Sequence, residues 1–364
     1  MLCLWSFLTT GIVVAQVSKD KIEINLPKMY QEVDEAIEQS PKYVRDYEKK
    51  ISDAKESMVR AKTDEQRMLL MMQLCELYES FNGDSALSYA FRATKIAHKL
   101  ELADVEADYQ ARCAYLCTFL GSQTEALTLL KRIDKKKLTK EGLGIYYRAY
   151  LSSYETLSDN CKMPELRKQF HQLHMLYLDS LLRAVPKGSE LYYFYYEDQL
   201  IKKRKLAQAL EMNDERLNMS GVGSHEDAII AYSRHRIYKD KGNREMAIYW
   251  LCRSALADIR NAVMDQLSLI TLAEVMDAQG DYDRSSRYIS FTWECNRRYS
   301  PHMRAWQITP LMSAIENNFQ MKLDEKNRQV KYLTISSAVL LFLLIVMILR
   351  GRLKRKKKQD KTVH

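Results

Sequence analysis

Four glycines recur along this 364-residue chain at a repeated spacing. Gly83 precedes Gly121 by 38 residues, and Gly242 precedes Gly280 by the same 38 residues. Each glycine follows an apolar segment with the periodicity of an α-helix. A repeat of this length holds one pair of helices. The chain is therefore predicted to build its core by stacking similar helical hairpins.

Small residues follow these glycines five positions further on. The pairs are Gly121 with Ala126, Gly242 with Ala247, and Gly280 with Ser285. Because small side chains let antiparallel helices approach closely, each hairpin is predicted to pack tightly just after its turn. After Gly83 the same count falls on Ser88, since Ala86 comes two residues early.

Residues 228–256 carry the most complete copy of this pattern. Its members are Ala231, Tyr238, Gly242, Ala247, Leu251 and Ala255. In this order the copy resembles the tetratricopeptide repeat, which has an aromatic residue on its first helix, glycine at the turn and alanine on its second helix. The resemblance implies an all-α fold, a solenoid of helical hairpins whose neighbours bury a continuous core.

Further helices are predicted between and around the clear copies. Those between them cover residues 141–158, 163–183, 189–204 and 205–219. Upstream, a short helix over 30–38 and a charged helix over 41–61 are expected to cap the stack.

A last helix is predicted to begin near Pro310, which suits a first helical turn. It carries an apolar stripe made of Leu311, Ile315, Phe319 and Leu323. The stripe allows a homodimer, and the helix is expected to continue unbroken into the segment that follows.

The composition agrees with an all-helical domain. Only 11 Gly and 6 Pro interrupt the chain, which is too few for the turns of a many-stranded sheet. Most of the formal net charge of +9 lies in the last fifteen residues, where eight Lys or Arg accompany a single Asp. A basic face for nucleic acid is therefore not predicted on the main domain.

Residues 332–349 form an uncharged apolar stretch followed at once by basic residues. As a helix these eighteen residues are about 27 Å long, close to the thickness of a hydrocarbon core. Tyr332, Leu340 and Leu349 lie within the predicted anchor, and Arg350 and Arg352 begin its basic flank. Since Lys and Arg favour the cytoplasmic side, the tail is expected inside and the hairpins outside, with lipid contacting this one span.

The N-terminal end is consistent with this orientation. Residues 2–14 are apolar, and Val13, Val14 and Ala15 resemble a signal-peptidase site before Gln16, although no basic residue precedes the run. The alternative is that residues 2–17 remain as a second span, which is short for that purpose.

A wider resemblance covers nearly the whole chain. A signal sequence, an opening stretch at 30–74, the segment Gly-Asp-Ser-Ala-Leu-Ser-Tyr at 83–89, further repeats, one span and a basic stretch together resemble bacterial membrane-anchored tetratricopeptide-repeat regulators. Members of that group usually continue into a cytoplasmic output domain, often one that binds DNA. This sequence stops at His364, so it is expected to be either truncated or active without such a domain, and direct nucleic-acid binding is not predicted.

The resemblance also implies where a partner would bind. In such repeats the first helices of the hairpins line a concave groove suited to a protein or peptide. Matching by position places seven residues there: Asp108, Tyr115, Tyr232, Arg236, Lys239, Glu274 and Asp277. The alternative is that these are ordinary polar positions on helix surfaces. The aromatic run at 191–196 is predicted to belong mainly to the core.

Residues capable of chemistry are sparse. Cys75, Cys113 and Cys117 occupy small-residue positions of first helices, and buried thiols are predicted. His171 and His174 share a helix face but have no partnering ligand motif, so no metal site is expected. Phosphate-binding loops and nucleophile motifs are missing from the sequence, and neither an enzyme nor a cofactor is predicted.

Six segments are therefore predicted. They are a signal peptide at 1–15, capping helices at 16–64, a tetratricopeptide-like solenoid at 65–301, a juxtamembrane helix at 302–331, a transmembrane helix at 332–349 and a cytoplasmic tail at 350–364. The predicted function is a periplasmic protein-binding module on the bacterial inner membrane that relays binding to a cytoplasmic partner. The alternative is a static scaffold that gathers envelope proteins.

Overall fold

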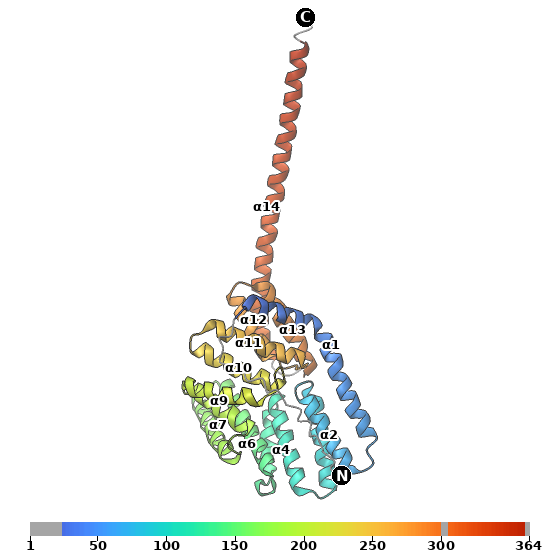
Figure 1. Ribbon diagram of the computed structural model, residues 1–364, viewed down its shortest axis with the longest axis vertical. Coiled ribbons are helices and arrows are strands. Elements are labelled where there is room, and N and C mark those ends of the chain that lie inside the picture. Colours follow the sequence, from blue (N-terminus) through green and yellow to red (C-terminus); the bar gives the residue numbers. More distant parts are fainter. Residues whose placement is uncertain (1–23, 300–304, 361–364) are drawn as a thin grey trace, which may run out of the picture. The chain divides into compact units, whose positions relative to one another are not determined.

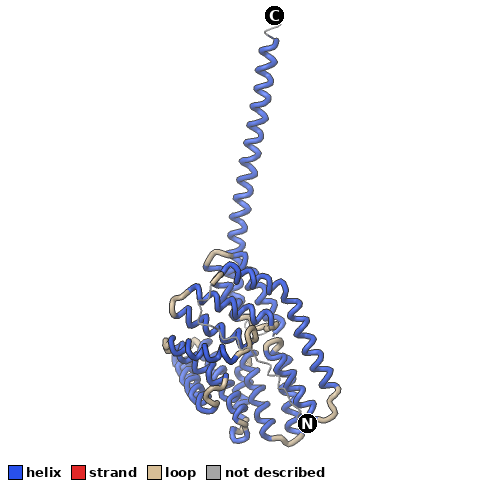
Figure 2. The backbone as a smooth tube through the Cα atoms, in the orientation of Figure 1, coloured by secondary structure: helices blue, strands red, loops and turns tan. Residues whose placement is uncertain are grey.

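The computed structural model describes residues 24–299 and 305–360. In these two ranges the backbone forms only helices and loops (Figure 2), which confirms the all-α prediction. The predicted signal sequence at 1–15 lies outside the described residues. The chain divides into two compact units, which are described separately: unit 1 covers 1–272 and 291–305, and unit 2 covers 273–290 and 306–364.

Unit 1 consists mainly of five helical hairpins, which follow one another in chain order (Figure 1). The hairpins are α2 (Asp64–Glu79) with α3 (Gly83–Lys99), α4 (Ala103–Phe119) with α5 (Gln123–Arg132), α6 (Lys140–Asn160) with α7 (Pro164–Ala184), α8 (Glu190–Lys202) with α9 (Leu206–Met219), and α10 (His225–Asp240) with α11 (Arg244–Arg260). The four helices expected at degenerate spacing are therefore present as α6 to α9.

The turns of three hairpins share one backbone geometry. Gly121, Gly242 and Gly280 all have a positive φ of 76–79°, and the next residue is the N-cap of the second helix. Glycine suits this left-handed position because it has no Cβ to clash with the backbone. The spacing of 38 residues therefore reflects a recurring turn.

The turn between α8 and α9 has the same geometry without glycine. Arg204 has a φ of 60°, and Lys205 is the N-cap of α9. Arg204 also lies 38 residues before Gly242, and the buried Ala209 follows it by five residues. The repeat thus extends back one copy further than the glycines indicate, with an arginine in the left-handed position.

The first hairpin uses a different turn, and the prediction for Ser88 is wrong. Asn82 is the N-cap of α3, so Gly83 is the first helical residue and has no positive φ. The fourth residue after the N-cap is Ala86, which is fully buried, whereas Ser88 is exposed. Ala86 therefore matches Ala126 and Ala247, because the register follows the N-cap and not the glycine.

The two helices predicted upstream are one continuous helix, α1 (Leu26–Val59), with Pro41 inside it. Proline lacks the backbone donor that would bond the carbonyl four residues earlier, which is a local penalty inside a helix. Packing overrides this local penalty. The first half of α1 buries Val33 and Ala36, and the second half buries Ile51 and Ala54.

Helix α1 also closes unit 1 into a cycle of contacts. It packs against α2, as the predicted cap would, and also against α11 of the fifth hairpin. Next to this contact, the Met264 N–H donates to the Ser80 carbonyl at 2.8 Å, and the Asn82 side chain donates to the Arg298 carbonyl at 2.8 Å. The first hairpin therefore meets the last segments of the same unit.

Unit 2 contains the turn between α12 (Leu267–Ala278) and α13 (Tyr282–Tyr299), together with most of α14 (Ala305–Asp360). Ser285 on α13 donates its hydroxyl to the Ala273 carbonyl on α12 at 2.9 Å, which shows the close approach predicted from its small side chain. Helix α14 begins five residues before Pro310, earlier than predicted, and continues without a break into the apolar stretch.

The apolar part of α14 is long enough and hydrophobic enough to cross a membrane. The candidate span lies within Leu311–Arg352, and its apolar window has a mean hydropathy of 2.6 with none of its residues buried by protein. Leu340 is 67% exposed and Leu349 is 52% exposed. Side chains of this kind need an apolar surrounding, which a lipid bilayer would provide.

Candidate functional site

A basic pocket lies in unit 1 where α8 and α10 end. Its volume is about 370 Å³, and it is lined by Ile201, Lys202, Arg204, Arg236, Lys239 and Asp240. The left-handed turn at Arg204 ends α8 and places its side chain beside the last turn of α10. The pocket thus contains four cations and one carboxylate, and two of those cations, Arg236 and Lys239, were predicted from the repeat pattern.

Asp198 links two cations of the basic pocket. Its carboxylate lies 2.9 Å from the Lys202 ammonium and 2.7 Å from the Arg236 guanidinium. Burial raises the pKa of Asp198, but the two cations outweigh burial and hold the pKa below its usual value. Lys202 also pairs with Glu155 at 3.2 Å, and Arg204 pairs with Asp240 at 3.4 Å.

Lys239 is exposed and has no carboxylate within ion-pair distance among the described residues. The carbonyl ends of α8 and α10 lie close by and offset part of the positive charge. The positive charge still affects His235: burial lowers the pKa of its imidazole, and the charges of Lys239 and Arg236 lower that pKa further. The basic pocket therefore remains suited to a negatively charged group.

A row of polar side chains continues from the basic pocket across the first helices of the hairpins. We call it the inner row: Glu79 on α2, Arg112 and Tyr115 on α4, Arg148 on α6, and Tyr195 and Asp198 on α8. Glu79 pairs with Arg112 at 3.0 Å, and the Arg148 guanidinium lies 4.3 Å from the centre of the Tyr115 ring. Arg148 also interacts electrostatically with the Tyr195 hydroxyl. First helices therefore share one face, as the resemblance implied.

Arg148 is the cation of the inner row that has no carboxylate partner in the described part of the chain, and its Nε has no hydrogen-bond acceptor there. Burial raises the pKa of the neighbouring Tyr115 and Tyr195, while Arg148 lowers it. A half-buried guanidinium without a counterion has unused capacity to bind an anion.

The other predicted partner-binding residues of unit 1 have structural roles. Tyr115 is only 1% exposed and packs edge-on against Phe119, so it is a buried member of the inner row. Asp108 accepts hydrogen bonds from the Thr139 N–H at 3.0 Å and its hydroxyl at 2.5 Å, which fixes the start of α6. The Tyr232 ring stacks on His235 and is partly buried.

Glu274 and Asp277 belong to unit 2. Glu274 is exposed, and Asp277 accepts both of its hydrogen bonds from the Asn318 amide of α14, at 3.0 and 3.2 Å. Lys322, one turn further along α14, donates to the Gly280 carbonyl at 3.3 Å and lies 5.2 Å from the centre of the Tyr282 ring. We call these contacts the α14 clamp. The Asp277 carboxylate is therefore already hydrogen-bonded to another part of the protein.

Sequence reasoning missed Lys202, Arg204, Arg148 and Asp198. The signal for Arg204 was present, since it continues the 38-residue spacing backwards from Gly242 and precedes a small residue at the right distance. Asp198 and Arg148 carried no such signal, because their importance depends on neighbours 38 and 47 residues away, respectively Arg236 and Tyr195.

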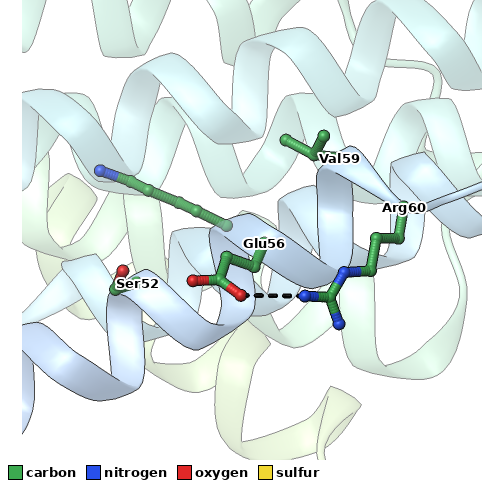
Figure 3. A pocket seen from close by; sticks show the side chains of 5 residues that line it. Ser52, Glu56, Val59 and Arg60 are labelled. Atoms are coloured by element: carbon green, nitrogen blue, oxygen red, sulfur yellow. Dashed lines mark hydrogen bonds and ion pairs between the residues drawn. The ribbon is translucent and has the colours of Figure 1, made fainter.

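A second pocket is lined by one helix alone and is a weak candidate for a binding site. Figure 3 shows Ser52, Glu56, Val59 and Arg60 along the end of α1, where Glu56 and Arg60 pair with each other at 3.1 Å. Both side chains of this pair are more than half exposed, which makes the contact weak.

The thiols and histidines show no chemical site in the described ranges. Cys75, Cys113 and Cys117 are buried, which confirms that prediction, and burial raises the pKa values of Cys75 and Cys117 to about 11. His174 is buried with its Nδ1 3.3 Å from the Leu151 carbonyl. The described residues contain no group of three or more potential metal ligands.

The aromatic run at 191–196 is half-buried, so the core prediction holds only in part. Leu191, Tyr192 and Tyr195 pack towards the α6–α7 hairpin, whereas Tyr196 packs towards α9 and α10. Phe194 lies beneath the buried guanidinium of Arg216 at 5.5 Å. The run thus joins two neighbouring hairpins and leaves part of its surface free.

Repeated hairpins, the recurring left-handed turn and the close contacts after each N-cap define a tetratricopeptide-repeat protein. Residues 37–310 match the family model of the SusR N-terminal TPR domain. The match covers most of the chain, which therefore belongs to this family. No curated protein matches the sequence. Tetratricopeptide repeats form non-catalytic modules for protein–protein interaction, and that is the class of function the fold defines.

Proposed function

We propose that this protein is a membrane-anchored receptor module. It binds a protein or peptide outside the cytoplasm and relays that binding through α14. In this proposal the hairpins face the periplasm of a bacterial cell, the 332–349 segment crosses the inner membrane, and the basic residues that follow lie in the cytoplasm. The family match supports the protein-binding part, and the sequence pattern around α14 supports the anchor.

The observation that carries the relay is the continuity of α14 within unit 2. The α14 clamp joins the helix to the α12–α13 turn at Asn318 and Lys322. From there the helix runs without interruption through the apolar stretch. A rotation or tilt imposed at the clamp would therefore be passed along a single rigid element, whereas a flexible linker would absorb it.

The anchor is tested by extraction and protease accessibility. We expect the full chain to stay in membranes after carbonate washing, and protease added to spheroplasts to digest the hairpins while sparing a short C-terminal fragment. Release by carbonate, or protection of the hairpins, would contradict the proposed topology.

The relay is tested by insertions between Asp324 and Lys331, beyond the α14 clamp. One added residue rotates the downstream helix by about 100°, whereas seven added residues nearly restore its phase. The transcript changes caused by deleting the gene define the output. We expect the one-residue insertion to reproduce those changes and the seven-residue insertion to leave wild-type levels, with equal membrane amounts of both. If both insertions behave like the wild type, a static scaffold replaces the relay.

A further inference from the structure

The basic pocket and the inner row carry more positive charge than their own carboxylates neutralise. The pocket contributes Lys202, Arg204, Arg236 and Lys239. The carboxylates that pair with them are Glu155, Asp198 and Asp240, which leaves one cation in excess. Arg148 adds a second, because Glu79 in the same row is already paired with Arg112.

The two unpaired cations lie on different hairpins. Lys239 is at the end of α10, Arg148 is on α6, and α8 contributes Tyr195 and Asp198 between them. Packed helices are separated by roughly 8–10 Å, so two steps from α6 through α8 to α10 correspond to about 16–20 Å between the outer helix axes. That distance corresponds to roughly five or six residues of an extended chain and exceeds the size of a small anion.

The surface between the two cations suits a polypeptide. Tyr195 belongs to the half-buried aromatic run of α8 and lies beside Arg148. Ile201 adds an aliphatic side to the basic pocket. Aromatic and aliphatic patches flanked by cations are typical of sites that bind acidic segments, where the apolar contacts add affinity and the charges set the register.

We propose that an extended acidic segment of the partner protein binds along this surface, with one carboxylate in the basic pocket near Lys239 and another near Arg148. This inference rests on the proposed function, because it names the chemistry of the partner that the receptor module binds. The binding is largely electrostatic, so it weakens as salt is raised.

The experiment uses the full chain in detergent micelles and a fluorescent ten-residue peptide of alternating Ser and Glu. The pocket variant is Arg236→Glu with Lys239→Glu. Its matched control is Lys131→Glu with Lys136→Glu, two exposed cations near the end of α5 that change the net charge by the same amount. The single variant Lys239→Gln removes one exposed cation with no described ion pair and should not disturb folding. Circular dichroism checks each variant.

We expect the pocket variant to bind the peptide at least about tenfold more weakly than the wild type, Lys239→Gln to bind about threefold more weakly, and the control to bind unchanged. Arg148→Gln should also weaken binding, and the Ser-Gln peptide should not bind. The basic residues after 349 are common to every variant, so their contribution remains constant.

Three results would overturn the inference. The peptide does not bind the wild type, or the pocket and control variants weaken binding equally, or inorganic phosphate at equal charge displaces the peptide completely and binds as tightly. The last result would make the site one for a small anion. The peptide experiment involves neither the membrane nor the relay. The insertion and protease tests can therefore succeed while the peptide fails to bind, and the peptide can bind while those tests fail.

Discussion

The α8–α9 and α10–α11 hairpins have the same backbone plan but different chemistry. Each has a left-handed residue, an N-cap and a buried alanine four residues later; these are Arg204, Lys205 and Ala209 in the first hairpin and Gly242, Asn243 and Ala247 in the second. The second fits the repeat pattern, whereas the first departs from it at the turn. The shared requirement is therefore the backbone conformation and the close contact, since two different residues satisfy the turn.

The interiors of these hairpins also differ. On α9, the Arg216 guanidinium is completely buried and pairs with two carboxylates of α8: Glu197, which is completely buried too, and Glu190, which is half-exposed. In the second hairpin, the Arg234 and Arg253 guanidiniums lie over the Trp250 ring of α11, 4.7 and 4.9 Å from its centre, and Arg253 is partly exposed. The first hairpin depends on a buried ion pair and the second on an aromatic side chain.

The largest predicted effect comes from breaking the buried pair. Arg216→Leu leaves the Glu197 carboxylate buried without its cation, and we expect a loss of about 3–5 kcal/mol in the free energy of unfolding. Arg253→Leu should cost less, because the Arg253 side chain is 22% exposed and water can reach its pair with Asp227, whereas both side chains of the Arg216–Glu197 pair are fully buried. Urea denaturation followed by circular dichroism measures both.

The control is the double variant Arg216→Leu with Glu197→Leu. Since it removes both buried charges and leaves only the half-exposed Glu190, which water can solvate, it should recover most of the lost stability. If the double variant is as unstable as Arg216→Leu alone, the effect arises from shape and not from the unpaired charge, and the contrast between the hairpins is then weaker than proposed.

An intermediate effect is expected where helices approach closely. Ala209→Leu and Ala247→Leu should each destabilise unit 1 by about 1–3 kcal/mol, because both alanines are buried just after their turns. Similar losses would show that the two hairpins share one geometry. The register in the first hairpin is tested by a matched pair: Ala86→Leu should cost a similar amount, whereas Ser88→Leu should change stability by less than about 0.5 kcal/mol. A larger loss for Ser88→Leu than for Ala86→Leu would instead support the register counted from Gly83.

Much of the fold was predictable from the sequence because its signals are local and periodic. The glycine spacing, the small residues and the apolar segments identified the hairpins, and the uncharged stretch identified the candidate span. Two features were not predictable, for physical reasons. Pro41 sits inside α1 because contacts with α11 and α2 outweigh a local penalty. Ala86 takes its role from the N-cap and not from Gly83.

The candidate site was less predictable than the fold. Arg236 and Lys239, which line the basic pocket, were among the predicted residues because they occupy helix positions that the repeat pattern identifies. Lys202 and Arg204 were missed because their hairpin has no turn glycine, and Arg148 was missed because a missing counterion is a property of three-dimensional neighbours. Tyr115 fitted the pattern but is buried, since the pattern alone does not give its exposure.

The smallest predicted effect bears on why an arginine occupies the turn of the α8–α9 hairpin. A non-glycine residue in the left-handed region costs about 1 kcal/mol, and Arg204 has this conformation with a φ of 60°. Arg204→Gly should relieve that strain, but it loses an exposed ion pair with Asp240 and adds freedom to the unfolded chain, so we expect a net gain of only about 0.5 kcal/mol.

The matched variant in the other hairpin should have the opposite sign. Gly242→Ala places a Cβ in the same left-handed conformation, where no other atom lies within 4 Å of it, so its expected loss of about 1 kcal/mol is due to the backbone alone. Strained residues that persist where glycine would be more stable are often part of a functional site. Arg204→Gly should therefore weaken binding of the acidic peptide while stabilising the fold. If it destabilises the fold and leaves peptide binding unchanged, Arg204 holds the α8–α9 turn to α10 and has no part in recognition.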